Sequence, residues 1–287
     1  IILLNELNQE RRWRLGIKGS KNYLVSPIFD CFYKVGQQPN MPYSFINLKN
    51  DKYKNDEDGL HAPGLGDFQG NLYKENNNHI EIEFDIFGLF FWMLSRAEEI
   101  DVAAGELDSH NRFHSKLSHS FKHNYLESPI IDEWIYFLRF LLIILWPKVV
   151  FKKENFTIEV SHDVDRPSAF AFGRKRDLIK QMGVSVLRRN DFLSAARAPF
   201  IFYTTKEELN KKDPYVTFDW IMQLSELRNI KSTFYFLTGK TSNQYDGNYD
   251  LEHPAILNLL RSIYKRGHKI GLHPSYEAIN DSSLLVG

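Results

Sequence analysis

Apolar and polar residues follow two different patterns along the chain, and the second half has the clearer one. Residues 156–165 read F-T-I-E-V-S-H-D-V-D, a β-branched run that predicts a strand with an acidic end. Residues 232–238 and 268–273 predict two further strands. Helical spacing of apolar residues predicts helices over 219–228 and 254–266. Alternation of strands and helices is typical of parallel βαβ units, so we expect a parallel sheet in this half.

The first half of the chain has a mixed pattern. Residues 80–85 alternate apolar and acidic side chains, which predicts a half-exposed strand. Residues 86–99 and 128–145 have apolar side chains at helical spacing and predict two helices. The stretch 47–78 is polar and rich in glycine and asparagine, which predicts a surface loop.

The change of pattern near residues 148–155 predicts a domain boundary. We therefore expect an N-terminal α+β domain over 1–150 and an α/β domain over 151–287. Residues 166–215 are basic and irregular, and the pattern assigns no element to them.

The charge of the chain disfavours one class of partner. Lysine plus arginine and aspartate plus glutamate number 36 each, so the formal net charge is zero. Nucleic-acid binding relies on a basic excess or a clear basic patch, and we therefore expect no nucleic-acid partner. The chain is 43% hydrophobic and 25% charged, as is typical of a globular protein with a core.

One apolar run and one cysteine bear on the location of the chain. The run from Trp134 to Val150 is interrupted by Arg139 and is shorter than the roughly 20 apolar residues of a membrane span, so it predicts a buried helix. No signal peptide is visible at the start of the chain, and Cys31 is the single cysteine. Both observations favour a cytoplasmic, reducing location.

Two carboxylates follow the first predicted strand of the second half. Asp163 and Asp165 lie two residues apart and point to one face in an extended chain, whereas His162 points to the other. Converging carboxylates repel unless a cation lies between them or one is protonated. A metal site and a pair of solvated turn residues both fit this pattern on its own.

A histidine follows the third predicted strand. His273 lies where the strand stops, and Pro274 suits the first position of a following helix. In that helical register Glu277 lies on about the same side as His273. His268 begins the strand, far from its C-terminal end, and a structural role is expected for it. A polar stretch of the first half has histidines every four or five residues, and we do not expect a metal site there: His110, His114, His119 and His123.

Three sequence blocks together resemble a known family. The order S-H-D-V-D (161–165), K-S-T-F-Y-F-L (231–237) and R-G-H-K-I-G-L-H-P-S-Y (266–276) resembles the bacterial polysaccharide deacetylases of the carbohydrate esterase type. Two blocks of the first half, F-W-M-L-S-R-A-E-E (91–99) and D-S-H-N-R-F (108–113), resemble the extra N-terminal domain of a subgroup of that family.

The resemblance implies a fold, a cofactor and residue roles. The second domain would form the first part of a distorted (β/α) barrel, with its site at the C-terminal strand ends. Asp163 would be the general base, Asp165 and His273 would be metal ligands, and a divalent ion such as Zn, Mn, Fe or Co would be bound. The reaction implied is hydrolysis of the N-acyl group of an amino sugar or polysaccharide, so an N-acylated carbohydrate is the expected substrate.

The chain departs from the family at two places. The second metal-binding histidine of the family is replaced by Glu277, which can itself bind a metal or remain a solvated residue. The later family motifs, which carry an arginine and a histidine general acid, would follow the end of this sequence, so we expect the chain to be a truncated, incomplete barrel. Two alternatives stay open: a glycan-binding module without activity, and another amide hydrolase on the same fold, for example one that acts on cyclic ureides.

Overall fold

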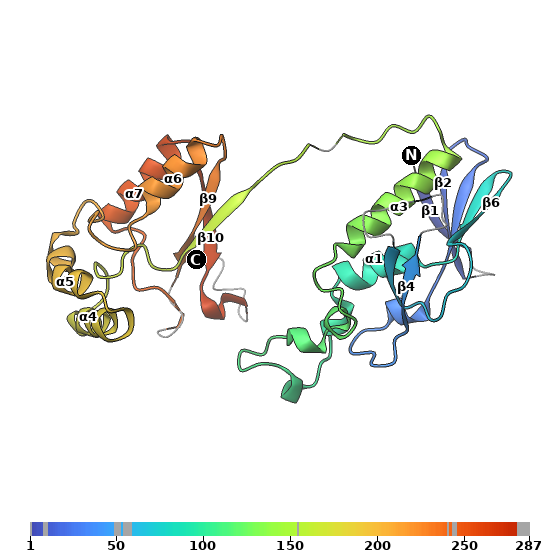
Figure 1. Cartoon of the computed structure of the whole chain (residues 1–287). Coiled ribbons are helices and arrows are strands. Elements are labelled where there is room, and N and C mark those ends of the chain that lie inside the picture. Colours follow the sequence, from blue (N-terminus) through green and yellow to red (C-terminus); the bar gives the residue numbers. More distant parts are fainter. Residues whose placement is uncertain are drawn as a thin grey trace. The chain divides into compact units, whose positions relative to one another are not determined.

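In the computed structural model the chain forms two compact units, with the boundary along the sequence between Lys153 and Glu154 (Figure 1). Both units combine strands and helices, so the predicted mixed α/β class is confirmed. Within the described part of the chain, the strands form open sheets and close no barrel. The structure describes residues 2–7, 11–48, 53, 59–153, 155–239, 241–242 and 246–279.

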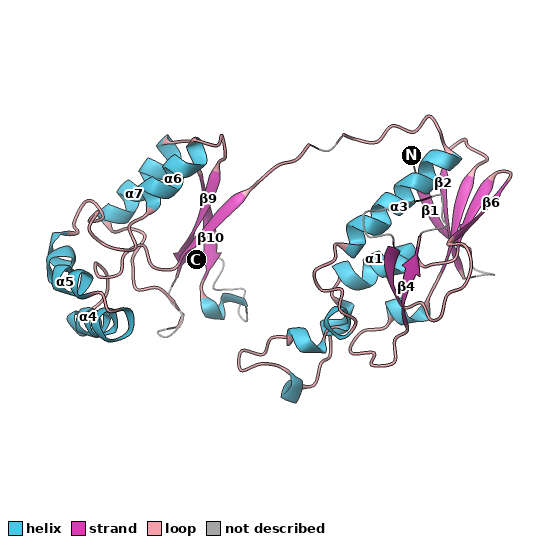
Figure 2. Cartoon of the chain, viewed as in Figure 1, coloured by secondary structure: helices cyan, strands magenta, loops and turns pink. Residues whose placement is uncertain are grey.

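The first unit is built on a five-stranded sheet with the order β1-β2-β3-β7-β6. Its neighbouring strands are antiparallel except for the parallel pair β3 and β7. Strands β4 and β5 form a separate antiparallel ribbon (Figure 2). The bounds are β1 Ile2–Leu7, β2 Arg12–Ile17, β3 Tyr23–Pro27, β4 Tyr43–Asn47, β5 Gly59–Pro63, β6 Tyr73–Asn76 and β7 His79–Ile82.

The described part of the first unit also contains three α-helices: α1 (Ile86–Leu94), α2 (His119–Lys122) and α3 (Ile130–Leu145). Helix α3 buries an apolar stripe against the sheet, with Trp134 fully buried and its ring stacked on Phe84 at 4.3 Å between centroids. The apolar run is therefore a core helix as predicted up to Leu145, whereas residues 146–150 lie beyond the helix and Val150 is exposed. Among the described residues, no helix is both long and apolar enough to cross a membrane.

The second unit contains a three-stranded parallel sheet with the order β10-β9-β8. Helices α6 and α7 pack on one face of this sheet and build its core with alternate strand residues (Figure 1). The fully buried side chains of Met222 from α6, Phe234 from β9 and Ile263 from α7 are at its centre. The bounds are β8 Val160–Val164, α4 Lys175–Arg189, α5 Phe192–Thr204, α6 Phe218–Glu226, β9 Ser232–Thr238, α7 Pro254–Lys265 and β10 Lys269–Pro274.

Three expectations about elements were wrong or incomplete. The unassigned stretch 166–215 contains the helices α4 and α5, which pack on one another around a small core. The predicted loop 47–78 contains the strands β5 and β6, whose pairing partners lie elsewhere in the chain. The helix expected to begin at Pro274 is absent, because β10 continues through Pro274 and a 3₁₀ turn follows over Tyr276–Ile279.

Candidate functional site

Three of the predicted site residues lie together at the C-terminal ends of β8 and β10. The Nε2 atom of His273 is 3.9 Å from Oδ2 of Asp163 and 3.8 Å from Oδ1 of Asp165. The side chains are 63% exposed for Asp163, 64% for Asp165 and 31% for His273, so the cluster is open to solvent. Parallel pairing of β8, β9 and β10 brings these strand ends to the same edge of the sheet.

The ring of His273 is held in one orientation by its own backbone neighbour. Its Nδ1 lies 2.8 Å from the carbonyl oxygen of Pro274. Because a carbonyl can only accept a hydrogen bond, Nδ1 carries the proton, and in the neutral ring Nε2 presents its lone pair toward the two carboxylates. Metal-binding histidines typically have this second hydrogen bond, which fixes both the tautomer and the ring orientation.

The distances in the cluster test whether a metal ion fits. Two ligand atoms about 2.1 Å from a tetrahedral ion lie about 3.4 Å apart. The separations of 3.8 and 3.9 Å between His273 and the carboxylates are about half an ångström wider than this. Within the described residues, no three histidine, cysteine or acidic side chains are already arranged as a metal site. Carboxylate oxygens and an imidazole nitrogen are donor types that a divalent ion accepts, but the cluster is more open than a formed metal site.

Tyr249 ties the strand ends beneath the cluster to one another. Its hydroxyl donates to the carbonyl oxygen of Val164 at 2.8 Å and accepts the backbone N–H of Leu237 at 2.7 Å. One side chain thereby joins the end of β8 to the end of β9. Burial raises the pKa of Tyr249, and the nearby charge of Asp165 raises it further, so this hydroxyl keeps its proton.

Asp246 organises the loops that follow β9 and β10. Its carboxylate accepts the backbone N–H groups of Thr241, Ser242 and Tyr276 at 2.6–2.8 Å. Burial raises the pKa of Asp246, but these hydrogen bonds outweigh burial and lower the pKa below its usual value. The loops are therefore fixed by an ionised carboxylate.

Gly247 leaves room for the backbone at the end of β8. A Cβ atom at this position would lie 2.2 Å from the carbonyl oxygen of Asp165, which no real structure tolerates. Tyr249, Asp246 and Gly247 escaped the sequence analysis. The Asp246-Gly247 pair is a turn signal between a strand and a helix, but it gives no indication of the role of Tyr249.

Glu277 is placed differently from the prediction. It lies in the 3₁₀ turn after β10, its side chain is exposed, and its backbone N–H donates to Oγ1 of Thr241 at 3.1 Å. The α-helical register that put it on the side of His273 does not exist in this structure. A role for Glu277 as a metal ligand stays a prediction.

Two further histidines of this unit, His162 and His268, make contacts away from the cluster. His162 points to the opposite face of β8, where its ring stacks on Phe234 and its Nε2 lies 3.3 Å from Oγ of Ser232. His268 is buried at the start of β10, accepts the backbone N–H of Ser232 at Nδ1 and faces Glu226 with Nε2.

Comparison with known proteins gives one finding. Residues 23–147 match the model of a family described as a family of unknown function (DUF7033). No curated protein and no solved structure matches the chain. The match lies wholly within the first unit, and the description of the family names no activity.

Proposed function

We propose that the second unit performs metal-dependent hydrolysis of the N-acyl group of an amino sugar or polysaccharide. The observation that supports this is the meeting of Asp163, Asp165 and His273 at one edge of the parallel sheet. These are the residues that the resemblance to polysaccharide deacetylases assigns to the base and to two metal ligands. They come from strands that are more than 100 residues apart in the sequence.

Asp165 and His273 would hold the ion, with Glu277 as a further candidate ligand. When bound, a divalent ion supplies Lewis-acid polarisation of the acyl carbonyl and lowers the pKa of water. Asp163 then accepts a proton from the attacking water as its oxygen bonds to the acyl carbon. The bond between this carbon and the sugar nitrogen breaks, and the nitrogen leaves with a proton as the amine. The exposure of the carboxylates gives a large glycan access to them.

The proposed fold is the first part of a distorted (β/α) barrel. Parallel strands with helices on one face and acidic residues at the carboxyl ends are what such a barrel would show over its first three strands. Strands β8 and β10 are both edges of the described sheet, which leaves each able to pair with a further strand.

Metal retention tests the proposal without depending on turnover. We expect the purified chain, after incubation with Zn, Mn, Fe or Co and desalting, to retain about one ion, and Asp165→Ala and His273→Ala to abolish retention. His162→Ala is the matched control, since it removes an imidazole from the opposite face of the same sheet. Release of acetate from an N-acetylglucosamine tetrasaccharide, lost in Asp163→Asn, tests the reaction. An ion held equally by all these variants would contradict the proposed site.

A second candidate is a glycan-binding module without hydrolysis. The observation that favours it is the open geometry, since the separations from His273 exceed those of a closed metal site. Two measurements distinguish the candidates. A binding module would hold the tetrasaccharide equally well with and without a chelator and would release no acetate at any metal concentration.

A further inference from the structure

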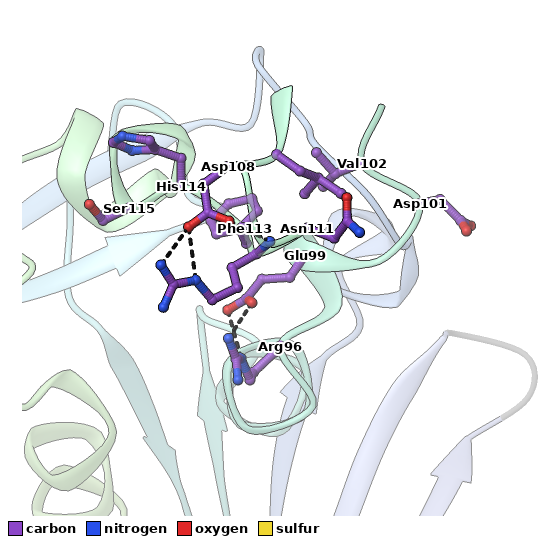
Figure 3. Close-up of a pocket in the computed structure, with 11 residues that line it drawn as sticks. Arg96, Glu99, Asp101, Val102, Asp108, Asn111, Phe113, His114 and Ser115 are labelled. Atoms are coloured by element: carbon purple, nitrogen blue, oxygen red, sulfur yellow. Dashed lines mark hydrogen bonds and ion pairs between the residues drawn. The ribbon is translucent and has the colours of Figure 1, made fainter. Parts of the chain in front are cut away.

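The first unit contains a polar cavity that the proposed reaction does not use. Its volume is about 870 Å³, and it lies between the 3₁₀ turn Ala97–Glu99 and the loop 107–115 (Figure 3). The turn lies in the block 91–99 and the loop overlaps the block 108–113, and both segments lie within the region that matches the family model. The size is that of a site for a small molecule or for a short oligosaccharide.

Two paired arginines line the cavity. Arg96 donates from Nε to Oε1 of Glu99 at 2.7 Å, and its Nη2 bonds the second carboxylate oxygen (Figure 3). Arg112 donates from Nε to Oδ2 of Asp108 at 2.8 Å, and its Nη2 lies 2.8 Å from the same oxygen. The side chains of Arg96 and Arg112 remain 72% and 71% exposed, so the two ion pairs are accessible to a ligand from solvent.

The loop that carries Arg112 is held rigid by one carboxylate. Asp108 accepts the backbone N–H groups of His110 and Arg112, and its own N–H donates to the carbonyl oxygen of Arg112. A β-bridge between Leu107 and Phe113 closes the loop at its base. Hydrogen bonds from Arg112 lower the pKa of Asp108 to about 2, so these bonds persist across the whole range of physiological pH. A loop that is already ordered loses little conformational entropy when a ligand binds.

The backbone at the rim of the cavity is unusual. Arg96, Asp101 and Asn111 each have a left-handed conformation, with φ of 54°, 56° and 56°. Residues other than glycine adopt this conformation at a cost, and such positions cluster at ligand sites. All three left-handed residues line the same cavity.

The charge of the lining indicates the class of ligand. Three acidic side chains, from Glu99, Asp101 and Asp108, outnumber the arginines Arg96 and Arg112. A phosphate or carboxylate ligand would have to displace a paired acid, which disfavours anions. A neutral ligand with many hydroxyl groups can instead donate to the carboxylates and accept from the guanidinium groups without breaking either pair.

We propose that this cavity is a second carbohydrate site, which binds a neutral oligosaccharide through the Arg96–Glu99 and Asp108–Arg112 pairs. The half-buried ring of Phe113 supplies an apolar surface for the C–H face of a sugar. The inference concerns the first unit alone and does not depend on hydrolysis in the second. It gives the first unit the role of holding a glycan.

Calorimetric titration of the full chain with an N-acetylglucosamine tetrasaccharide, maltotetraose and citrate tests the proposal. We expect at least one of the neutral oligosaccharides to bind and citrate not to compete. Arg96→Met and Arg112→Met should each weaken binding about ten-fold or more, because each removes charged hydrogen bonds to the ligand. Arg11→Met is the matched control, since Arg11 is also left-handed, exposed and paired with an acid, but does not line the cavity.

Two further variants separate the cavity from folding and from the second unit. Ser115→Trp places bulk at the cavity wall and leaves both ion pairs intact, and it should abolish binding without changing the thermal transition. Asp163→Asn should leave this binding unchanged. The proposal is overturned if neither neutral oligosaccharide binds, if Arg11→Met weakens binding as much as the cavity variants, or if citrate binds in preference to the sugars.

Discussion

The buried imidazole of His119 makes the stability of the first unit depend on pH. The residue is buried, with only 6% of its surface exposed. Its Nδ1 lies 2.6 Å from the hydroxyl of Tyr125, and its ring packs against His123 at 4.2 Å between centroids. Burial, together with the neighbouring His123, lowers the pKa of His119 to about 4.

The magnitude follows from the two protonation states. Above its unfolded pKa of about 6.5, His119 is neutral in both states and the native unit has its full stability. As the pH falls below this value, His119 becomes protonated in the unfolded chain but stays neutral in the native state until the pH is near 4. The loss between about pH 7.5 and about pH 5 is therefore about 2 kcal/mol.

Asp85 opposes this effect and has to be separated from it. Burial raises the pKa of Asp85 to about 6, so proton uptake by the native state stabilises the same unit as pH falls from about 6 toward its usual value. The two contributions largely cancel in the wild-type chain. The difference between wild type and His119→Phe at each pH removes the Asp85 contribution, because both chains keep this residue.

Chemical denaturation followed by tryptophan fluorescence measures that difference. Trp220 is the single tryptophan of the second unit and is 64% exposed, so a Trp220→Phe background leaves four tryptophans that all report the first unit. At pH near 7.5 the His119→Phe variant should be about 1–3 kcal/mol less stable, since the Tyr125 hydroxyl loses its partner. Near pH 5 this deficit should shrink by about 2 kcal/mol. A deficit that stays constant, or that grows as pH falls, would refute the reasoning.

Three further substitutions or treatments have defined outcomes. Gly247→Ala should destabilise the second unit by more than about 1 kcal/mol in urea titration, because its Cβ would collide with the Asp165 carbonyl, whereas Gly105→Ala, with open space, should be within about 0.5 kcal/mol of wild type. Tyr249→Phe leaves two buried backbone groups without their partner and should cost about 1–3 kcal/mol, and an unchanged urea midpoint would contradict this. Burial raises the pKa of the Cys31 thiol, so iodoacetamide should alkylate it more slowly at pH near 8 than it alkylates free cysteine, and an equal or faster rate would contradict this.

Elements that carry their own pattern could be predicted from the sequence. The strand predicted over 232–238 is found as β9 over Ser232–Thr238, because β-branched and aromatic residues fill a strand that is buried in the sheet. The meeting of Asp163, Asp165 and His273 also follows from sequence, since carboxyl ends of parallel strands share one edge of a sheet.

Features that depend on partners distant in the sequence could not be predicted. Strand β5 is defined by its pairing with β4, and its own residues, Gly59–Pro63, contain turn formers at both ends. Helix α5 contains Pro199, and the buried side chains by which it packs are mostly small. The bridging role of Tyr249 depends on two backbone groups more than ten residues away and has no local signal.

The long interval between β8 and its partner has a consequence for synthesis of the chain. Val160 pairs with Ser232, about 70 residues later, so at about 5–20 residues per second β8 leaves the ribosome several seconds before β9 exists. The α4 and α5 hairpin has local contacts and can form within that time. During this time both edges of β8 are unpaired. The polar side chains of Ser161, His162 and Asp163 disfavour its pairing with strands of other chains, which would lead to aggregation. The polar residues of β8 thus protect the nascent chain until β9 is available for pairing.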